Sequence, residues 1–174
     1  MNKKDQPIGS ALTTIDLHDI ARACITFGVS GFFVVTPYED QAKLATQVID
    51  HWTKGVGGEL NPFRKKALEL IRVSKTFEDA LKEIEKEREE PVITIATSAK
   101  EISGSITTEN LRQKLDNQAS HVLIFGTAWG LAEPLIQAAD YTLTPIATGT
   151  GYNHLSVRSA VAIVLDRLLG DQGI

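Results

Sequence analysis

The stretch HVLIFGTAWGLAEPLIQAADYTLTPIATGTGYNHLSVRSAVAIVLDRLL, residues 121–169, carries the strongest fold signal in this chain. It predicts, in order, a strand, a glycine loop, a helix, a strand, a second glycine loop and a very apolar last helix. Glycine loops at strand ends are where α/β proteins bind nucleotide-like ligands. The two loops therefore predict two walls of one small-molecule site.

Further from this stretch, strands and helices keep alternating. Buried strands are predicted at 31–36 and 92–99, with further strands at 121–127 and 141–146. Helices are predicted over 17–28, 38–52, 62–74, 77–90, 108–118, 130–139 and 155–170, with a loop at 55–62 and an extended polar segment at 1–13. This alternation predicts one α/β domain, 1–174, with a mostly parallel sheet and helices on both faces.

Local signals mark some of the helix ends. Asp16 is placed to cap the first helix, and Gly28 to end it. Thr76 with Asp79 resembles a capping box at the start of the charged helix, whose charge run is most simply a solvated face.

Composition excludes several classes of protein. The 174 residues are 43% hydrophobic and 23% charged, and no apolar run is long enough to cross a bilayer. The N-terminus lacks the apolar core of a secretory signal, and the single Cys24 cannot form an internal disulfide, so we expect a reducing, cytoplasmic setting. Cys24 lies among core-type residues and is expected to be a packed small hydrophobe.

The charged residues favour neither bulk nucleic-acid binding nor a metal site. The net charge of −4 disfavours non-specific wrapping of nucleic acid, but it leaves an RNA substrate open because local patches matter more than the sum. The four histidines have no metal-ligand spacing, so we expect no metal; they are His18, His51, His121 and His154.

The first glycine loop is FGTAWGL, residues 125–131. Its glycines allow backbone N–H groups to come close to a ligand, and Trp129 could cover an apolar ligand edge. The alternative is a plain turn with the tryptophan plugged into the core. The absence of both the phosphate-loop and the dinucleotide fingerprints disfavours an ordinary nucleotide-binding oxidoreductase.

The second loop, residues 144–156, gathers Tyr152, Asn153, His154 and Ser156 before the last helix. One helix cap needs only one of these side chains, so the surplus favours a ligand site.

The last helix is apolar nearly all round, which predicts either cover by a second subunit or tight burial within one chain. Arg22 lies in an apolar helix, where it could hold phosphate or simply face solvent.

Taken together, these residues resemble a known family. Phe125–Leu131, Leu143–Ile146 and Tyr152–Ala162 look like the three segments that form the cofactor-binding knot of SPOUT-class methyltransferases. His18–Val35 is similar to the first motif of the SpoU-like branch, and Arg22 falls on that motif's arginine. The strings FGTAWGL and YNHLSVRSAVAIVLDRLL most resemble a small SPOUT family of RNA methyltransferases, found alone or fused behind tRNA (guanine-N1)-methyltransferase.

The resemblance implies a parallel-sheet α/β domain with a C-terminal trefoil knot that binds S-adenosyl-L-methionine (SAM). It implies a homodimer packed through the last helix, an RNA substrate (tRNA or rRNA), and tRNA (guanine-N1)-methyltransferase as a partner. Arg22 takes the catalytic role. The implied cofactor-binding residues are Thr97, Ser98, Phe125, Gly126, Thr127, Ala128, Trp129, Gly130, Leu131, Pro145, Ile146, Tyr152, Asn153, His154, Leu155, Ser156 and Ser159.

The chain departs from the SpoU-like pattern in three places. The second motif has no acid after Gly126, and the third reads His154-Leu155-Ser156 in place of Asn-Val-Ser, which argues against a ribose 2′-O mechanism. Most of the strand that family members carry before KKDQPIGSAL is also missing, which predicts a lost edge strand or a trimmed sequence. The second functional hypothesis is a SAM-binding dimerisation or regulatory module without methyl transfer.

Overall fold

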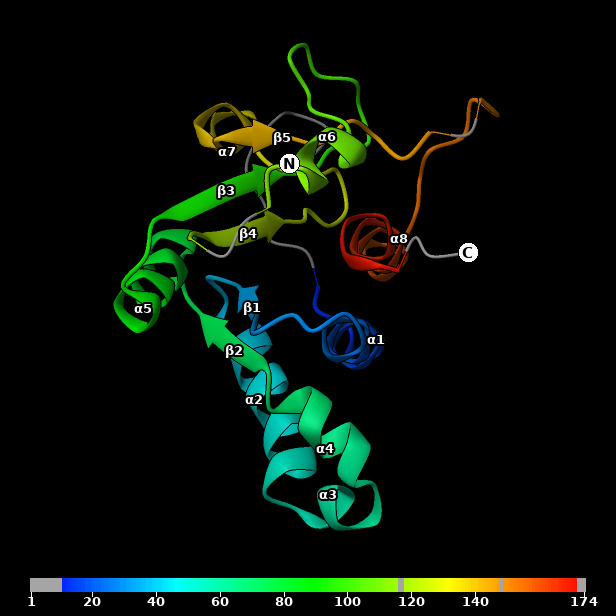
Figure 1. The fold of residues 1–174 in the computed structure, drawn as a ribbon. Helices are drawn as coiled ribbons and strands as arrows, with labels where there is room; N and C mark the ends of the chain where they lie inside the picture. The colour runs from blue at the N-terminus through cyan, green and yellow to red at the C-terminus, as the bar shows by residue number, and fades with distance from the viewer. Residues whose placement is uncertain (1–10, 116–117, 148, 172–174) are drawn as a thin grey trace. The chain divides into compact units, whose positions relative to one another are not determined.

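The computed structural model describes residues 11–115, 118–147 and 149–171. It divides into two compact units, one formed by residues 11–83 and the other mainly by residues 84–174 (Figure 1). Every strand pairing is parallel, as predicted, but the described strands form two separate sheets rather than one. The predicted N-terminal segment 1–13 lies largely outside the described residues.

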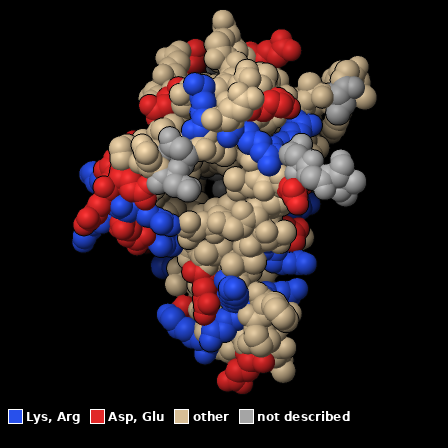
Figure 2. All heavy atoms as spheres, viewed as in Figure 1, with Lys and Arg blue, Asp and Glu red and all other residues tan. Residues whose placement is uncertain are grey.

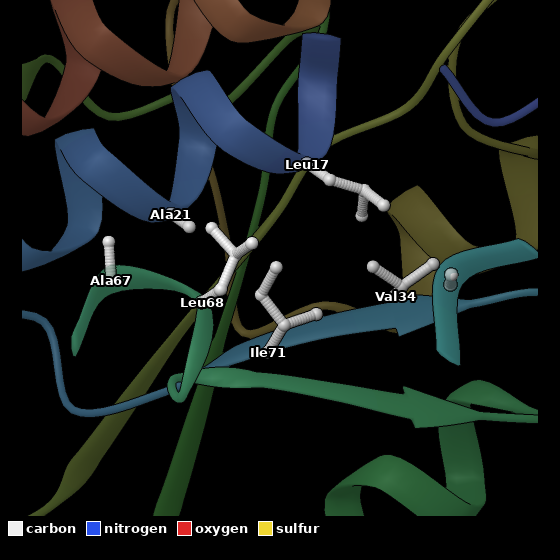
Figure 3. Close-up of a cluster of buried hydrophobic side chains, with 7 residues drawn as sticks. Leu17, Ala21, Val34, Ala67, Leu68 and Ile71 are labelled. Carbon is white, nitrogen blue, oxygen red and sulfur yellow. The ribbon is translucent and has the colours of Figure 1, made fainter. Parts of the chain in front are cut away.

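The unit of residues 11–83 is a two-stranded sheet with helices packed on it. Its strands are β1 (Phe32–Val35) and β2 (Ile71–Ser74), with Phe32 opposite Ile71. Its helices are α1 (Thr14–Thr26), α2 (Glu39–Thr53), α3 (Val56–Leu60) and α4 (Pro62–Leu68). The core lies where these elements meet, and Figure 3 shows the facing side chains of Leu17, Ala21, Val34, Ala67, Leu68 and Ile71.

Cys24 of α1 is buried, which confirms that it is a packed hydrophobe. Burial raises the pKa of its thiol to about 11, so the nucleophilic thiolate is scarce at neutral pH.

Two predictions for this unit are wrong. The predicted loop 55–62 contains helix α3, because Gly57 and Gly58 are buried against Trp52, where a Cβ on either glycine would collide with its neighbours. The predicted helix 62–74 ends at Leu68, and the chain then forms β2. A four-residue strand is too short to show a period, and the tertiary pairing with β1 decides its structure.

The ends of the first helix follow the prediction in part. Its N-cap is Thr13, whose hydroxyl accepts a hydrogen bond from the Asp16 N–H at 3.2 Å; Asp16 stands in the first turn and is not the cap. Gly28 follows the helix at φ 71°, a left-handed conformation that favours glycine, as expected.

Helix α5 (Phe77–Arg88) begins as predicted, with the Asp79 N–H donating to the Thr76 hydroxyl at 3.1 Å. Its Lys, Arg, Asp and Glu side chains are exposed, and Figure 2 shows them as mixed blue and red over α5 at the left. This charge run is therefore a solvated face, as predicted.

The other unit is a three-stranded parallel sheet in the order β4-β3-β5 (Figure 1). The strands are β3 (Val92–Ala96), β4 (Ser120–Ile124) and β5 (Tyr141–Thr142), and the helices are α6 (Thr108–Arg112), α7 (Glu133–Ala138) and α8 (Val157–Leu169). The apolar core joins the sheet to α6 and α8 through Ile95, Leu111, Leu143, Val164 and Leu168.

Several elements here are shorter than predicted, and the strands 92–99 and 121–127 already end at Ala96 and Ile124. Strand 141–146 reduces to β5 plus a bridge between Leu143 and Ile106, and helix 130–139 begins only at Glu133. Helix 108–118 ends at Arg112, and positions 116–117 of that prediction lie outside the described residues.

A carboxylate fastens the centre of this sheet to the start of β5. Asp140 Oδ2 accepts hydrogen bonds from the Thr94 N–H at 2.8 Å and from the Thr94 hydroxyl at 2.7 Å. These bonds lower the pKa of Asp140, the backbone bond contributing most. The contact fixes β5, and hence the segment that follows it, beside β3.

Within the described ranges, no helix is both long enough and apolar enough to span a membrane. The same residues contain no group of three or more His, Cys, Asp or Glu side chains arranged to hold a metal ion.

The surroundings of His18 predict how the stability of this protein responds to acid. Its Nδ1 is buried with no hydrogen-bond partner among the described residues, and its ring meets the Trp52 ring edge-on at 5.4 Å. Burial lowers the His18 pKa; the charges of Arg64 and Arg22 also lower it, and Asp19 opposes them. With the folded-state pKa below the unfolded one, the neutral ring's contribution is full above about pH 6.5 and is lost as pH falls through the folded pKa.

We therefore expect His18→Phe to lose less stability than the wild type between pH 7.5 and pH 5.5. Urea unfolding at both pH values measures this difference. An equal loss in the two proteins contradicts the assignment, because phenylalanine keeps an aromatic ring at the site without a titrating group.

Candidate functional site

The carboxyl ends of three parallel strands meet at one edge of the β4-β3-β5 sheet. Thr97 follows β3, Phe125 follows β4, and the segment 143–147 follows β5. The Thr97 N–H and hydroxyl both donate to the Ile124 carbonyl, at 3.0 and 2.8 Å, which ties the ends of β3 and β4 together. This edge is where open parallel sheets bind ligands.

The first glycine loop closes on itself after β4. The Gly130 N–H donates to the Thr127 carbonyl at 3.0 Å, and Ala128 between them has φ 52°. That left-handed conformation costs an alanine about 1 kcal/mol or more, and such strain is concentrated at functional sites. A Cβ on Gly126 would lie 2.5 Å from the Leu131 nitrogen, so only glycine fits this close approach.

Trp129 at the turn of this loop is 60% exposed, which rules out the alternative that it is plugged into the core. Leu131 is half-buried, and Phe125 packs against the core cluster of the sheet. The loop therefore presents one large aromatic ring to its surroundings while its base is fixed by packing.

The second glycine loop is attached to the segment after β3. The Asn153 side-chain amide donates to the Ala99 carbonyl at 3.0 Å, and Tyr152 meets His154 edge-on at 5.3 Å between ring centroids. Tyr152, His154 and Leu155 are exposed, and Ile146 packs on the core that Phe125 also contacts. The structure therefore brings Thr97, Ser98 and the two loops to one edge of this unit.

Ser156 and Ser159 have a structural role in this arrangement. Ser156 is the N-cap of α8, accepting from the Ser159 N–H at 3.4 Å, and the two hydroxyls are 2.8 Å apart. The cap uses these two groups and leaves Tyr152 and His154 unused by it. Fewer polar side chains before α8 are therefore left over from capping than the sequence suggested, but Tyr152 and His154 still are.

A pocket of about 380 Å³ opens between the segments that follow β3 and β5. Its lining is Glu101, Ile102, Gly104, Ser105, Thr144, Pro145 and Ala147. Two hydrogen bonds hold its walls together, from the Ile106 N–H to the Thr142 carbonyl at 2.8 Å and from the Thr144 N–H to the Ile106 carbonyl at 2.9 Å. A carboxylate and two hydroxyls therefore line an accessible space at the strand ends.

Of this lining, sequence reasoning named Pro145 as a site residue and placed Thr144 and Ala147 in the second loop. The signal for Ile102, Gly104 and Ser105 was the loop 102–107, which follows a predicted strand and contains Gly104 at φ 82°. Glu101 adds a carboxylate to the pocket lining, and the first glycine loop has no acidic side chain.

Arg22 is exposed on α1 and belongs to the unit of residues 11–83, whereas the two glycine loops belong to the other unit. Its backbone carbonyl accepts from the Thr26 hydroxyl, and its charge contributes to the lowered pKa of His18 one turn earlier. A shared site for Arg22 and the loops stays a prediction.

Comparison with solved structures identifies the class of fold. The chain is similar to the SpoU methyltransferase AviRb from Streptomyces viridochromogenes, a structure in complex with the cofactor AdoMet. The match has a TM-score of 0.57 and 12% identity, and it covers 97% of this chain and 60% of that one. At this identity the likeness shows the fold, which is that of SPOUT-class methyltransferases.

Comparison of sequences identifies the family. Residues 1–170 match the model of a family described as SAM-dependent RNA methyltransferase. The chain is 43% identical over 171 residues to a tRNA (guanine-N(1)-)-methyltransferase of Oleidesulfovibrio alaskensis, covering 98% of this chain but 40% of that protein. It is 34% identical to an uncharacterized protein of Aquifex aeolicus, covering 97% of this chain and 82% of that one. The chain belongs to the SAM-dependent RNA methyltransferase family.

The cofactor of this family is SAM, and the residues at the strand ends fit it. SAM combines an apolar adenine face with ribose hydroxyls, an ammonium and a carboxylate. The described residues offer an exposed tryptophan at position 129, the Ser98, Ser105 and Thr144 side chains, and the Glu101 carboxylate. Within the described residues, a Cβ built on Gly130, Gly149 or Gly151 meets no atom within 4 Å beyond its chain neighbours, so there is open space beside these three glycines.

Proposed function

We propose that this chain is a SAM-dependent RNA methyltransferase that acts on tRNA or rRNA as a homodimer. The observation that carries the proposal is the convergence of both glycine loops, Thr97 and Ser98 at one sheet edge in a chain of this family. The chain spans 40% of the length of the tRNA methyltransferase of Oleidesulfovibrio alaskensis. We therefore also propose that it works with a tRNA (guanine-N1)-methyltransferase.

We propose that SAM is held by the strand-end segments. SAM supplies a methyl group on a sulfonium centre, and this chain's residues position the acceptor in line with it. In this proposal the backbone at Gly126, Leu131, Ile146 and Leu155 holds the adenine and ribose. The proposed contacts also include Thr97, Ser98, Phe125, Thr127, Ala128, Trp129, Gly130, Pro145, Tyr152, Asn153, His154, Ser156 and Ser159.

Arg22 is the proposed catalytic residue. Its guanidinium is exposed, and a planar fork of donors suits an RNA phosphate or an oriented acceptor. A base nitrogen of RNA is itself nucleophilic, so an acceptor of that kind needs no strong general base. The proposal thus agrees with the lack of an acid in the first loop.

The trefoil knot is part of the same proposal, as is the treatment of 1–174 as one methyltransferase domain. Three adjacent parallel strands and the bond from Asn153 back to Ala99 support the knot. The fold likeness to a SpoU methyltransferase supports it further.

A free Cys24 with a buried thiol agrees with a reducing, cytoplasmic setting.

Methyl transfer itself tests the proposed function. The full chain is incubated with methyl-labelled SAM and, separately, with bacterial tRNA and rRNA, and the labelled nucleotide is identified by mass spectrometry. We expect label in one RNA pool and SAM binding by calorimetry. SAM binding without any transfer supports the second candidate, a SAM-binding dimerisation or regulatory module; the acid-free first loop favours that candidate. Failure to bind SAM contradicts both.

The proposed dimer packs through α8. The described chain already buries Val161, Val164, Leu165 and Leu168, so burial within one chain explains one face of the helix. Leu155, just before the helix, remains 46% exposed, and Leu169, its last residue, 44% exposed. These apolar groups are the ones that a second subunit would cover.

We expect the protein to sediment at micromolar concentration at twice its 19.0 kDa chain mass. Leu155→Glu with Leu169→Glu should shift it to the monomer, because buried unpaired carboxylates are costly. The matched control is Glu85→Gln with Lys86→Gln on the solvated face of α5. A wild-type protein that is monomeric throughout this range contradicts the dimer, since stable interfaces bury large apolar areas.

A further inference from the structure

Helices α3 and α4 leave two large apolar side chains almost fully exposed. Leu60 is 86% exposed and Phe63 is 87% exposed. Side chains this exposed contribute little burial to the fold, and exposed apolar groups that gather in a patch rimmed by polar residues mark interaction surfaces. The packing of this unit therefore does not explain why position 63 is aromatic.

Three cations follow Phe63 directly along α4. Arg64, Lys65 and Lys66 occupy a helix that contains no acid. Glu59 and Glu69 lie just outside it, and Asp50 is engaged by Lys54 at 2.8 Å. In a chain of net charge −4 this is a local positive segment, and Figure 2 shows blue side chains beside tan surface over α3 and α4, with red at one edge.

The segment is held in place by contacts within its own unit. The Arg64 guanidinium stacks 4.8 Å from the centroid of Trp52, and the Asn61 side chain caps α4 by accepting from the Arg64 N–H at 3.0 Å. Buried Gly57 and Gly58 bring α3 against Trp52. An exposed ring beside three cations, of which Arg64 is held against Trp52, suits a ligand with flat faces and negative charges. Unpaired RNA combines both features, because its bases stack on aromatic rings and its phosphates attract Lys and Arg.

We propose that the surface formed by Leu60, Phe63, Arg64, Lys65 and Lys66, the α4 surface, binds an unpaired stretch of the substrate RNA. One base stacks on Phe63, and Lys65 and Lys66 contact the neighbouring phosphates. This inference rests on the proposed function, because it takes the substrate to be RNA. It adds a contact that lies apart in sequence from the glycine loops and from Arg22.

Fluorescence anisotropy with a labelled 20-mer of uridine, with bacterial tRNA as competitor, tests this proposal on the full chain. We expect Phe63→Ala to weaken binding about fivefold or more, the loss typical of one base-stacking aromatic. Phe63→Trp should bind like the wild type, and Phe63→Leu like Phe63→Ala. Lys66→Ala should reduce the slope of log affinity against log salt by roughly 0.7, the value for one phosphate contact to a single strand.

The control is Lys86→Ala on α5, which should leave affinity and salt slope unchanged; SAM binding should be unchanged in every variant. If Phe63→Leu or Phe63→Ala binds RNA as tightly as the wild type, the α4 surface is not an RNA site, whereas the proposed function stands. If the wild type neither binds RNA nor transfers methyl, the proposed function fails and this inference fails with it.

Discussion

An Arg22→Ala protein is expected to bind SAM within a few-fold of the wild type but to lose most of its methyl transfer to RNA. The expected loss in kcat/KM is about 2–4 kcal/mol, or roughly 30- to 1000-fold, which is typical of removing one preorganised electrostatic contact. Arg22 is exposed on α1, so its removal leaves the fold intact. Arg22→Lys should recover only part of the activity, because lysine keeps the charge without the guanidinium fork.

The matched control is Arg88→Ala, another exposed helix arginine, which should leave turnover unchanged. Methyl transfer is measured under single-turnover conditions, and SAM affinity by calorimetry. If the protein proves to be a SAM-binding module, affinity for RNA replaces transfer as the measured quantity. Unchanged turnover and RNA affinity in Arg22→Ala would establish Arg22 as a solvated surface residue.

Gly126→Ala is expected to weaken SAM binding at least about tenfold. The added Cβ would lie 2.5 Å from the Leu131 nitrogen and 2.6 Å from the Gly130 carbonyl carbon, so the first glycine loop has to open. Overpacking of this kind costs about 1–3 kcal/mol and displaces backbone. Calorimetric titration with SAM and thermal unfolding of the same variant separate the loss of binding from the loss of stability.

Gly28→Ala is the matched control, because Gly28 has φ 71° and open space around its Cβ position. It should lose stability through backbone strain and keep its SAM affinity. Gly130→Val is a weaker probe of the same site, since Gly130 has φ 92° and any side chain there strains the loop directly. Wild-type SAM affinity in Gly126→Ala would mean that this loop does not hold the cofactor.

Some of the local structure could be predicted from the sequence. The cap at Thr76, the end of α1 at Gly28 and the existence of strands β1 and β3 follow from short-range signals. The predicted burial is only partly right, because Val34 is the one buried residue of β1 and Val35 is 43% exposed. Strand β2 and helix α3 could not be predicted, because one depends on pairing with β1 and the other on glycines packed against Trp52. The exposure of Trp129 likewise depends on how its loop folds back onto Gly126.

The sequence by itself determined the family, the alternation of strands and helices, and both glycine loops, because each is written in residues that are close together along the chain. Only the tertiary structure decided which of these residues meet. Asn153 and Ala99 are 54 positions apart and become neighbours because parallel strands place their carboxyl ends at one edge. The Glu101–Thr144 pocket and the exposed ring of Phe63 are also set by long-range packing, which no local pattern encodes.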